Sequence, residues 1–265
     1  MPDWCEQAPG VYTRRYEELD LTVGLVVGGE RCLVVDTRGS RVQGRELAGA
    51  VREVTPLPVT IALTHAHFDH AFGVSAFPHA PVWAHTRCRT ALAARGDRDR
   101  REWTERYRRD GRSDLADELA ATPVVLPTRT FDDVARLDLG GRGVELVHPG
   151  RGHTDHDVLV VAGDVVFAGD LVEHDAGGSF TAESFGPDTD LDAWPAALDV
   201  VAGHRPRVVV AGHGEPVDSA FLTRAGAQLR TLARLRSDVR AGALGLDDAL
   251  AASPLRAEVT RAALA

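Results

Sequence analysis

Lysine and asparagine are both absent from this sequence, so each of its 30 Lys/Arg positions is an arginine. Without lysine the chain has no amine side chain that could form a Schiff base, and any side chain that clamps an anion must be an arginine. Acidic residues number 39 and bring the formal net charge to -9. Nucleic-acid binding generally needs basic surface for phosphate contacts, so this balance argues against a nucleic-acid partner.

Cysteine is scarce, with only Cys5, Cys32 and Cys88 present and no close spacing among them. Three isolated cysteines indicate neither a disulfide framework nor a thiolate metal site. The sequence also lacks a hydrophobic run long enough to cross a membrane. Its first residues have neither the basic start nor the apolar core of a signal peptide. We therefore expect a reduced, soluble, cytoplasmic protein with no membrane partner.

Short apolar runs and amphipathic segments follow one another along the 265 residues, of which 44% are hydrophobic. Runs typical of strands fall at 11–15, 21–27, 32–36, 59–63, 81–84, 136–139, 144–148, 158–161, 165–168 and 208–211. Helical patterns fall at 42–54, 191–202 and in the tail from 219 onwards. The strand runs form two groups, one before residue 86 and one after residue 122. Two sheets packed face to face with helices outside would bury both groups. We predict a single domain over residues 1–265.

An arginine-rich segment at about 86–122 separates the two groups of strands. It has a helical pattern and no β-branched runs, so we predict a helical insertion. We expect it to fold beside the opening of the candidate site formed by the histidine-rich sequence that follows the apolar run at 59–63. Its interleaved acidic and basic residues favour a solvated helix face over a nucleic-acid surface.

The sequence Thr-His-Ala-His-Phe-Asp-His at 64–70 directly follows the apolar run at 59–63. His65 and His67 are two residues apart, so their rings can leave the backbone on the same side. Asp69 and His70 follow on the turn that starts a helix. Three imidazoles and a carboxylate within six residues form a nitrogen-rich ligand set that suits zinc.

This His-x-His-x-Asp-His pattern resembles that of the metallo-β-lactamase superfamily, and the resemblance extends over about 21–216. It implies an α/β fold, a four-layer αβ/βα sandwich of two mixed β-sheets flanked by helices. It also implies three further metal ligands: His153 in Gly-Arg-Gly-His-Thr, Asp170 after Phe-Ala-Gly, and His213 within Gly-His-Gly. Glycines next to such ligands permit tight turns close to a metal.

The resemblance implies a metal-dependent hydrolase with two zinc ions, although iron or manganese could serve. A metal-bridging hydroxide would attack an ester, thioester, lactone or related bond of a small molecule. Asp69 would be catalytic, because it can orient that hydroxide or move its proton. Asp170 would bridge the metals. Several β-lactam hydrolases of the family have cysteine at the Asp170 position and use lysine and asparagine near the substrate, so the family name does not predict a lactam substrate.

Two alternatives share this fold: an iron-dependent dioxygenase similar to persulfide dioxygenases, and a non-catalytic metal-binding protein. Glyoxalase II thioesterases carry Gly-His after the third histidine motif, where this chain has His156-Asp157. We interpret His156 as lying outside the metal ligands, and His174 as either a pocket-wall or a surface residue. The sequence predicts no oligomeric state.

Overall fold

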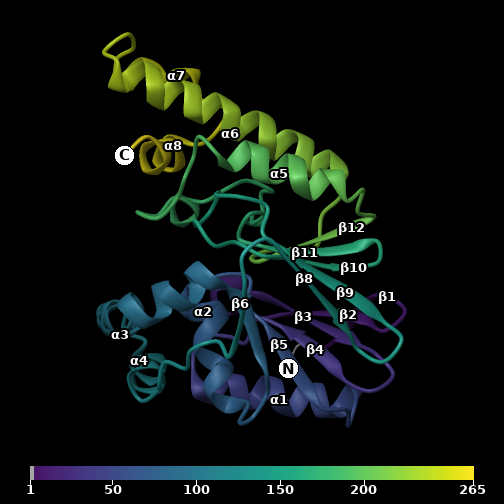
Figure 1. Cartoon of the computed structure of the whole chain (residues 1–265). Helices are drawn as coiled ribbons and strands as arrows, with labels where there is room; N and C mark the ends of the chain where they lie inside the picture. The colour runs from purple at the N-terminus through teal and green to yellow at the C-terminus, as the bar shows by residue number, and fades with distance from the viewer. Residues whose placement is uncertain (1–2) are drawn as a thin grey trace.

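Two β-sheets pack face to face between two layers of helices in the computed structural model, which describes residues 3–265 (Figure 1). The first sheet has the order β1-β2-β3-β4-β5-β6-β7, and its strands are Cys5–Ala8, Val11–Arg15, Thr22–Val27, Cys32–Val35, Val59–Ala62, Val82–His85 and Arg129–Phe131. The second has the order β12-β11-β10-β9-β8, and its strands from β8 to β12 are Val134–Asp138, Gly143–Val147, Leu159–Ala162, Val165–Gly169 and Val208–Ala211.

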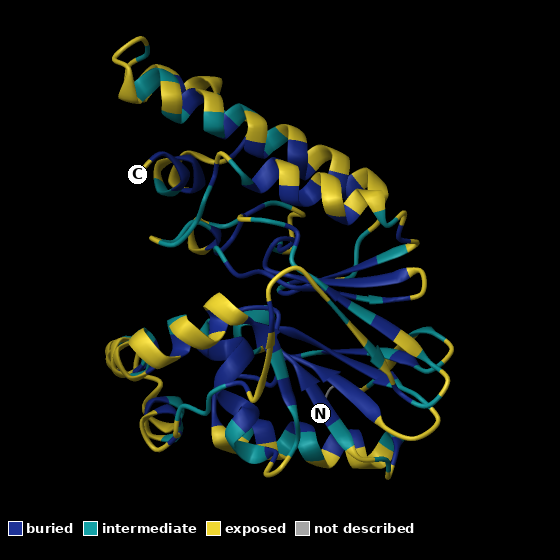
Figure 2. Cartoon of the chain, in the orientation of Figure 1, coloured by how far each residue is buried: buried dark blue, intermediate teal, exposed yellow. Residues whose placement is uncertain are grey.

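Both sheets are mixed. Strands β1 to β4 pair antiparallel, whereas β4, β5, β6 and β7 pair parallel. In the second sheet only the β11–β12 pair is parallel. Side chains such as Leu33, Leu146 and Val160 fill the space between the sheets and are fully buried. Figure 2 shows the central strands as buried along most of their length, in agreement with their continuous apolar runs.

Helices cover the outer face of each sheet. The helices from α1 to α8 are Arg41–Val54, Phe68–Ala71, Thr86–Arg109, Ser113–Ala120, Trp194–Gly203, Ser219–Arg240, Leu246–Ala252 and Ala257–Leu264. Three short 3₁₀ helices, η1 to η3, are Glu18–Asp20, Phe72–Ala76 and Ala182–Ser184. Leu47 and Val51 of α1 face the first sheet, and Leu198 of α5 and Leu229 of α6 belong to the core on the second. The predicted four-layer sandwich of two mixed sheets is therefore confirmed.

Helices α3 and α4 lie in the segment between β6 and β7, on the side of the first sheet. Trp103 and Tyr107 of α3 pack against Phe68 at the start of α2, with ring centroids 4.4 and 6.1 Å apart respectively. Because Phe68 lies within the His-rich sequence, this contact places α3 next to the loop after β5. No helix within residues 3–265 combines the length and apolar character that a membrane span requires.

Candidate metal centre

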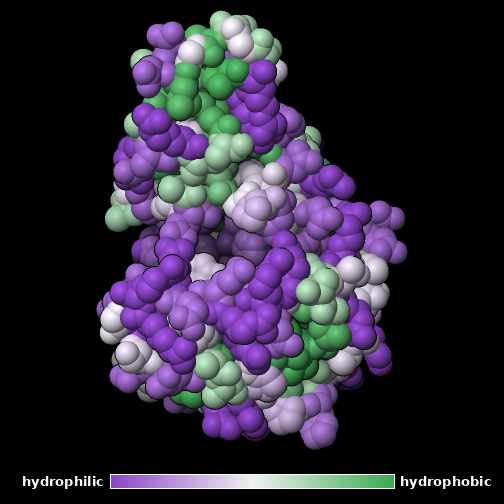
Figure 3. All heavy atoms as spheres, turned by 90° about the vertical axis from the view of Figure 1, so that its left-hand side faces the viewer, coloured by the Kyte–Doolittle hydropathy of each residue, from purple (hydrophilic) through white to green (hydrophobic). Residues whose placement is uncertain are grey.

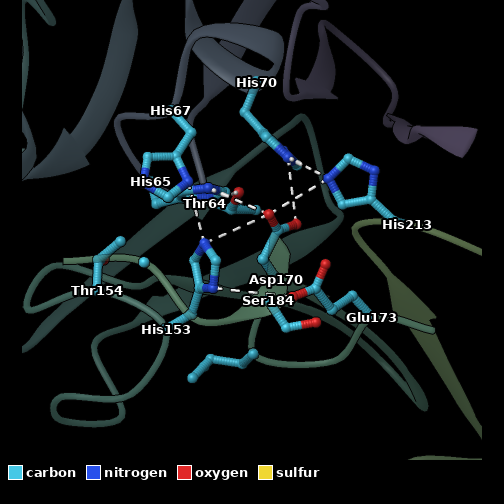
Figure 4. Close-up of polar contacts among 12 residues, drawn as sticks. Thr64, His65, His67, His70, His153, Thr154, Asp170, Glu173, Ser184 and His213 are labelled. Atoms are coloured by element: carbon cyan, nitrogen blue, oxygen red, sulfur yellow. Dashed lines mark hydrogen bonds and ion pairs between the residues drawn. The ribbon is translucent and has the colours of Figure 1, made fainter. Parts of the chain in front are cut away.

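The loops that follow four strands meet at one edge of the sandwich. His65 and His67 follow β5, and Asp69 and His70 lie in α2 directly after them. His153 lies between β9 and β10, Asp170 follows β11, and His213 follows β12. Figure 4 shows side chains from these loops pointing toward one another around Asp170. The structure thus brings all seven predicted site residues together.

One group of donor atoms comes from His65, His67, His153 and Asp170, and all four lie within 4.8 Å of one another. His153 Nε2 is 3.0 Å from His67 Nδ1, and His65 Nε2 is 3.4 Å from Asp170 Oδ2. His65 and His153 are almost fully buried. Three imidazoles and one carboxylate at this spacing form a set that fits a tetrahedral divalent metal.

A second group comes from Asp69, His70 and His213, whose donor atoms also lie within 4.8 Å of one another. His70 Nε2 and His213 Nε2 are 3.3 Å apart. Asp170 adjoins this group as well, with Oδ1 3.2 Å from His70 Nε2 and Oδ2 3.3 Å from His213 Nε2. Its carboxylate therefore lies between the two groups.

The buried atoms of this centre that have no hydrogen-bond partner among the described residues include His65 Nε2 and Asp170 Oδ1. A buried polar group that makes no bond costs about 1–3 kcal/mol. Both atoms carry lone pairs and lie among other potential ligand atoms, so a shared cation can satisfy them. The residues therefore fit a metal.

Oxygen acceptors outside the two groups orient four of the histidines, and for His213 the acceptor is the backbone oxygen of Leu19, 2.7 Å from Nδ1. Asp36 Oδ2 accepts from His70 Nδ1 at 2.8 Å, and Asp188 Oδ2 lies 3.4 Å from His67 Nε2. Thr64 Oγ1 donates to Asp36 and so accepts from His65 Nδ1 at 3.0 Å. Each contact fixes the ring proton on the nitrogen that points away from the centre and leaves the other nitrogen free to bind a metal.

The histidines of the centre differ in their ring pKa values, and that of His67 is raised by Asp188 despite burial. Burial lowers the pKa of His65 well below its usual value and that of His153 to about 3, so both rings are neutral at neutral pH. Burial alone would also lower the pKa of His213, but the carboxylates of Asp170 and Asp69 raise it to about 10. The pKa of His70 is raised for the same reason, with Asp170 as its strongest partner.

His156 lies outside both groups. Its Nε2 accepts from the backbone N–H of Ala66 at 3.2 Å, and its Nδ1 pairs with Asp155 at 2.7 Å. Burial lowers its pKa to about 4, so the ring is neutral and can accept. His156 therefore supports the loop between His65 and His67.

A family model described as the metallo-beta-lactamase superfamily matches residues 18–213 of the chain. The chain belongs to this superfamily.

Two similar curated relatives are both named metallo-beta-lactamase type 2, one from Bacillus sp. (strain 170) and one from Bacillus cereus. Each is 26% identical over 207 residues, which are 75% of this chain and 69% of the relative. Among solved structures, a metallo-beta-lactamase from Pontibacter korlensis aligns with a TM-score of 0.66 at 20% identity, over 87% of this chain and 99% of that one. This structural similarity supports the four-layer fold described above.

Glu173 is a further acidic residue of the centre, and the sequence did not predict it. It is 6% exposed, and one of its oxygens lies with Asp170 and His213 in a third group of potential ligands. Burial, followed by the charge of Asp170, raises its pKa to about 8. Its Oε1 is 4.0 Å from His153 Nδ1, and both atoms are buried without a hydrogen bond.

A cavity of about 720 Å³ opens over the candidate centre. Trp103 and Arg106 of α3 line one side, and residues 181–183 and 185–188 line the other. His174 also lines it, with its ring nitrogens 2.8 and 2.9 Å from the backbone oxygens of Asp175 and Glu215. Figure 3 shows this side of the molecule, which is hollowed at mid-height and largely hydrophilic around the hollow.

Proposed function

We propose that the protein is a zinc-dependent hydrolase that binds two zinc ions and cleaves an ester, thioester, lactone or related carbonyl bond of a small molecule. The observation that carries this proposal is the position of the Asp170 carboxylate between two complete groups of ligands. His65, His67 and His153 would hold one ion, Asp69, His70 and His213 the other, and Asp170 both. A non-catalytic metal-binding protein would need only one metal site, with every coordination position filled by the protein.

Zinc suits the donors better than iron does. The ligand set has five imidazoles, two carboxylates and no thiolate. Imidazole nitrogens bind zinc in their neutral form, and such a nitrogen-rich set suits this metal. The iron-dependent dioxygenase alternative uses one metal, and it leaves the group of Asp69, His70 and His213 without a role. The size of the cavity supports a small-molecule substrate, since such sites generally enclose about 300–1,000 Å³.

Bound zinc would supply an activated water at neutral pH and an electrophile for the substrate carbonyl. The chain itself supplies the remaining functions. Asp69 lines the cavity, and its Oδ2 lies 3.4 Å from His213 Nε2 and 3.6 Å from His70 Nε2. This carboxylate can orient an attacking water and carry its proton toward the leaving group. Asp36, Asp188 and Thr64 hold the ligand rings in place.

The test combines metal analysis with turnover. Protein purified without chelator should contain about two equivalents of zinc. After reconstitution it should hydrolyse at least one class in a panel of esters, thioesters, lactones, lactams and phosphodiesters. The lactam is included because the curated relatives are named as lactamases. At most one metal equivalent in excess zinc, or oxygen consumption by the iron-loaded protein without hydrolysis, would overturn the proposal.

A further inference from the structure

We propose that the cavity selects uncharged substrates with an apolar or aromatic arm and discriminates against substrates that carry a carboxylate or phosphate on that arm. The inference rests on the proposed hydrolase function and narrows its substrate class.

Acidic side chains outnumber basic ones on the wall of the cavity beyond the candidate metal ligands. Five further acidic residues line it: Asp20, Glu173, Asp175, Glu183 and Asp188. Among the described residues that line the same cavity, Arg106 is the only arginine. Because the chain has no lysine, no other permanently charged side chain of the wall can attract an anion.

Arginines near the wall are already paired with its acids. Arg95 Nη2 is 3.0 Å from Asp188 Oδ2, and Arg256 Nη2 is 2.7 Å from Asp175 Oδ2. Arg15 pairs in the same way with Asp20. A substrate anion that bound one of these arginines would have to displace a carboxylate of the protein. The exchange would therefore add little binding free energy.

Arg106 is occupied from two directions. Its Nη1 donates to Glu183 Oε2 at 2.9 Å, and its Nη2 donates to the other oxygen of the same carboxylate. Its guanidinium carbon also lies 4.5 Å from the ring centroid of Trp103. This two-pronged contact is the geometry with which arginine would otherwise bind a carboxylate of the substrate. Glu183 therefore takes the place of an anionic ligand.

Aromatic rings form the apolar part of the wall. Phe68 and Trp103 lie with ring centroids 4.4 Å apart on the α3 side. Phe185 lines the cavity from the loop after β11 and packs against Trp194 at 5.7 Å, which holds its ring in place. Rings on both sides can cover an apolar arm whose carbonyl reaches the metal centre.

A matched pair of esters tests the charge discrimination. The para-nitrophenyl esters of para-tolylacetic acid and para-carboxyphenylacetic acid differ only in a methyl group against a carboxylate, far from the reacting bond. The zinc-reconstituted protein should cleave the neutral ester with a kcat/KM at least about tenfold higher, after subtraction of the uncatalysed rates. Equal values, or a preference for the carboxylate, would overturn the inference.

Variants of the Arg106–Glu183 ion pair test whether this pair causes the preference for the neutral ester. Glu183→Gln frees Arg106, so the preference for the neutral ester should narrow severalfold. The double variant Glu183→Gln/Arg106→Gln should restore it, because the freed cation is then absent. Both side chains are partly exposed, at 58% and 41%, so these variants should fold. An unchanged ratio in Glu183→Gln would contradict the role given to the pair.

A binding measurement separates this inference from the proposed function. Titration calorimetry with para-tolylacetamide and para-carboxyphenylacetamide reports affinity without turnover. If neither ester is cleaved but the neutral amide binds more tightly, hydrolysis of such esters fails and the inference stands. If the carboxylated amide binds at least as tightly as the neutral one, the inference fails whatever the ester rates.

Discussion

Asp170 is the residue through which the two ligand groups meet. Its carboxylate follows β11, a strand whose residues are all buried, so the backbone that carries it is held firmly. One oxygen lies nearest His70, and the other lies near both His65 and His213. A single side chain therefore links both candidate metal positions, which no other residue of the centre does to the same extent.

Substitution of Asp170 should affect both metals. Asp170→Ala removes the negative charge between two cations, so their repulsion is no longer offset and at least one zinc ion should be lost. Hydrolysis should fall by several powers of ten, because the chemistry depends on the metal pair. Elemental analysis of the purified variant, together with its kcat on the best substrate of the panel, measures both effects.

His156→Ala is the matched comparison. This ring accepts from the backbone N–H of Ala66 and lies in neither ligand group, so the variant should keep near-normal zinc content. Its activity should fall by about 10–100-fold, as is usual when an outer support of a metal site is removed. If His156→Ala loses a metal while Asp170→Ala keeps two, the ligand assignment is wrong.

Zinc binding should release protons, and His213 and His70, whose pKa values are both raised, should be their main sources. With a pKa of about 10 in the metal-free protein, His213 is protonated at pH 7.5, and the ring must be neutral to bind a metal. His65 and His153 have lowered pKa values and should contribute none. Calorimetry in buffers of different ionisation enthalpy gives the number of protons. Zinc affinity should accordingly weaken as the pH falls.

His213→Ala provides the control for this assignment. Zinc binding by this variant should release about one proton fewer than the binding of the same number of zinc ions by the wild type at pH 7.5. Release that is unchanged in this variant would place the proton on another group.

At the level of single residues, the motif at 64–70 and the family resemblance that it carries predicted the ligands but not their supports. The motif at 64–70 and the glycine-flanked His213 have recognisable neighbours in the sequence. Asp36, Glu173 and Asp188 do not, because each is a lone acid whose partner lies far along the chain, such as His70 for Asp36. Asp36 did carry one signal, since it is the acidic last residue of the apolar run at 32–36.

At the level of elements, β3 and β11 approach each other closely between the two sheets. Gly24 of β3 faces Phe167 of β11, and a Cβ built at Gly24 would lie 2.2 Å from the Phe167 ring. Phe167 is 2% exposed and belongs to the core between the sheets. Since Asp170 lies three residues after Phe167 and directly follows β11, this packing also fixes the end of β11 beside the metal centre.

Gly24→Ala should therefore destabilise the protein by about 1–3 kcal/mol, the usual cost of an added carbon in a filled core. Chemical denaturation measures this loss. Gly49→Ala is the control, because Gly49 is exposed in α1 with nothing within 4 Å of its added Cβ. That change should instead stabilise the helix by about 0.5–1 kcal/mol. A Gly24→Ala variant as stable as the wild type would show that the sheets can separate without cost.

Elements with a strong apolar pattern were predicted close to their observed bounds, as with the helix expected at 42–54 and found at Arg41–Val54. The edge strands β1 and β7 were missed. Their sequences, Cys-Glu-Gln-Ala and Arg-Thr-Phe, are largely exposed and have no clear alternation. They are strands because a neighbouring strand offers backbone partners, which a local pattern cannot record.

At the level of the whole molecule, the candidate centre joins the two halves of the chain. His65, His67, Asp69 and His70 come from the first half, which forms the first sheet. His153, Asp170 and His213 come from the second half, which forms the second. The sandwich itself is filled by apolar cores between the sheets and under both helical layers. Metal ions would therefore reinforce the contact between the halves without being needed to create it.

Removal of metal should lower the stability of the protein without unfolding it. One zinc site at a hundredfold excess over its dissociation constant contributes about 2.7 kcal/mol. For a domain of this size that corresponds to a drop of about 5–10 °C in the midpoint of thermal unfolding after chelation. Far-ultraviolet circular dichroism at room temperature should be unchanged, because the three cores persist. His156→Ala should show the same drop on chelation, whereas Asp170→Ala should show a smaller one. Loss of the folded spectrum in chelator would mean instead that the metals hold the halves together and that the apolar cores alone do not.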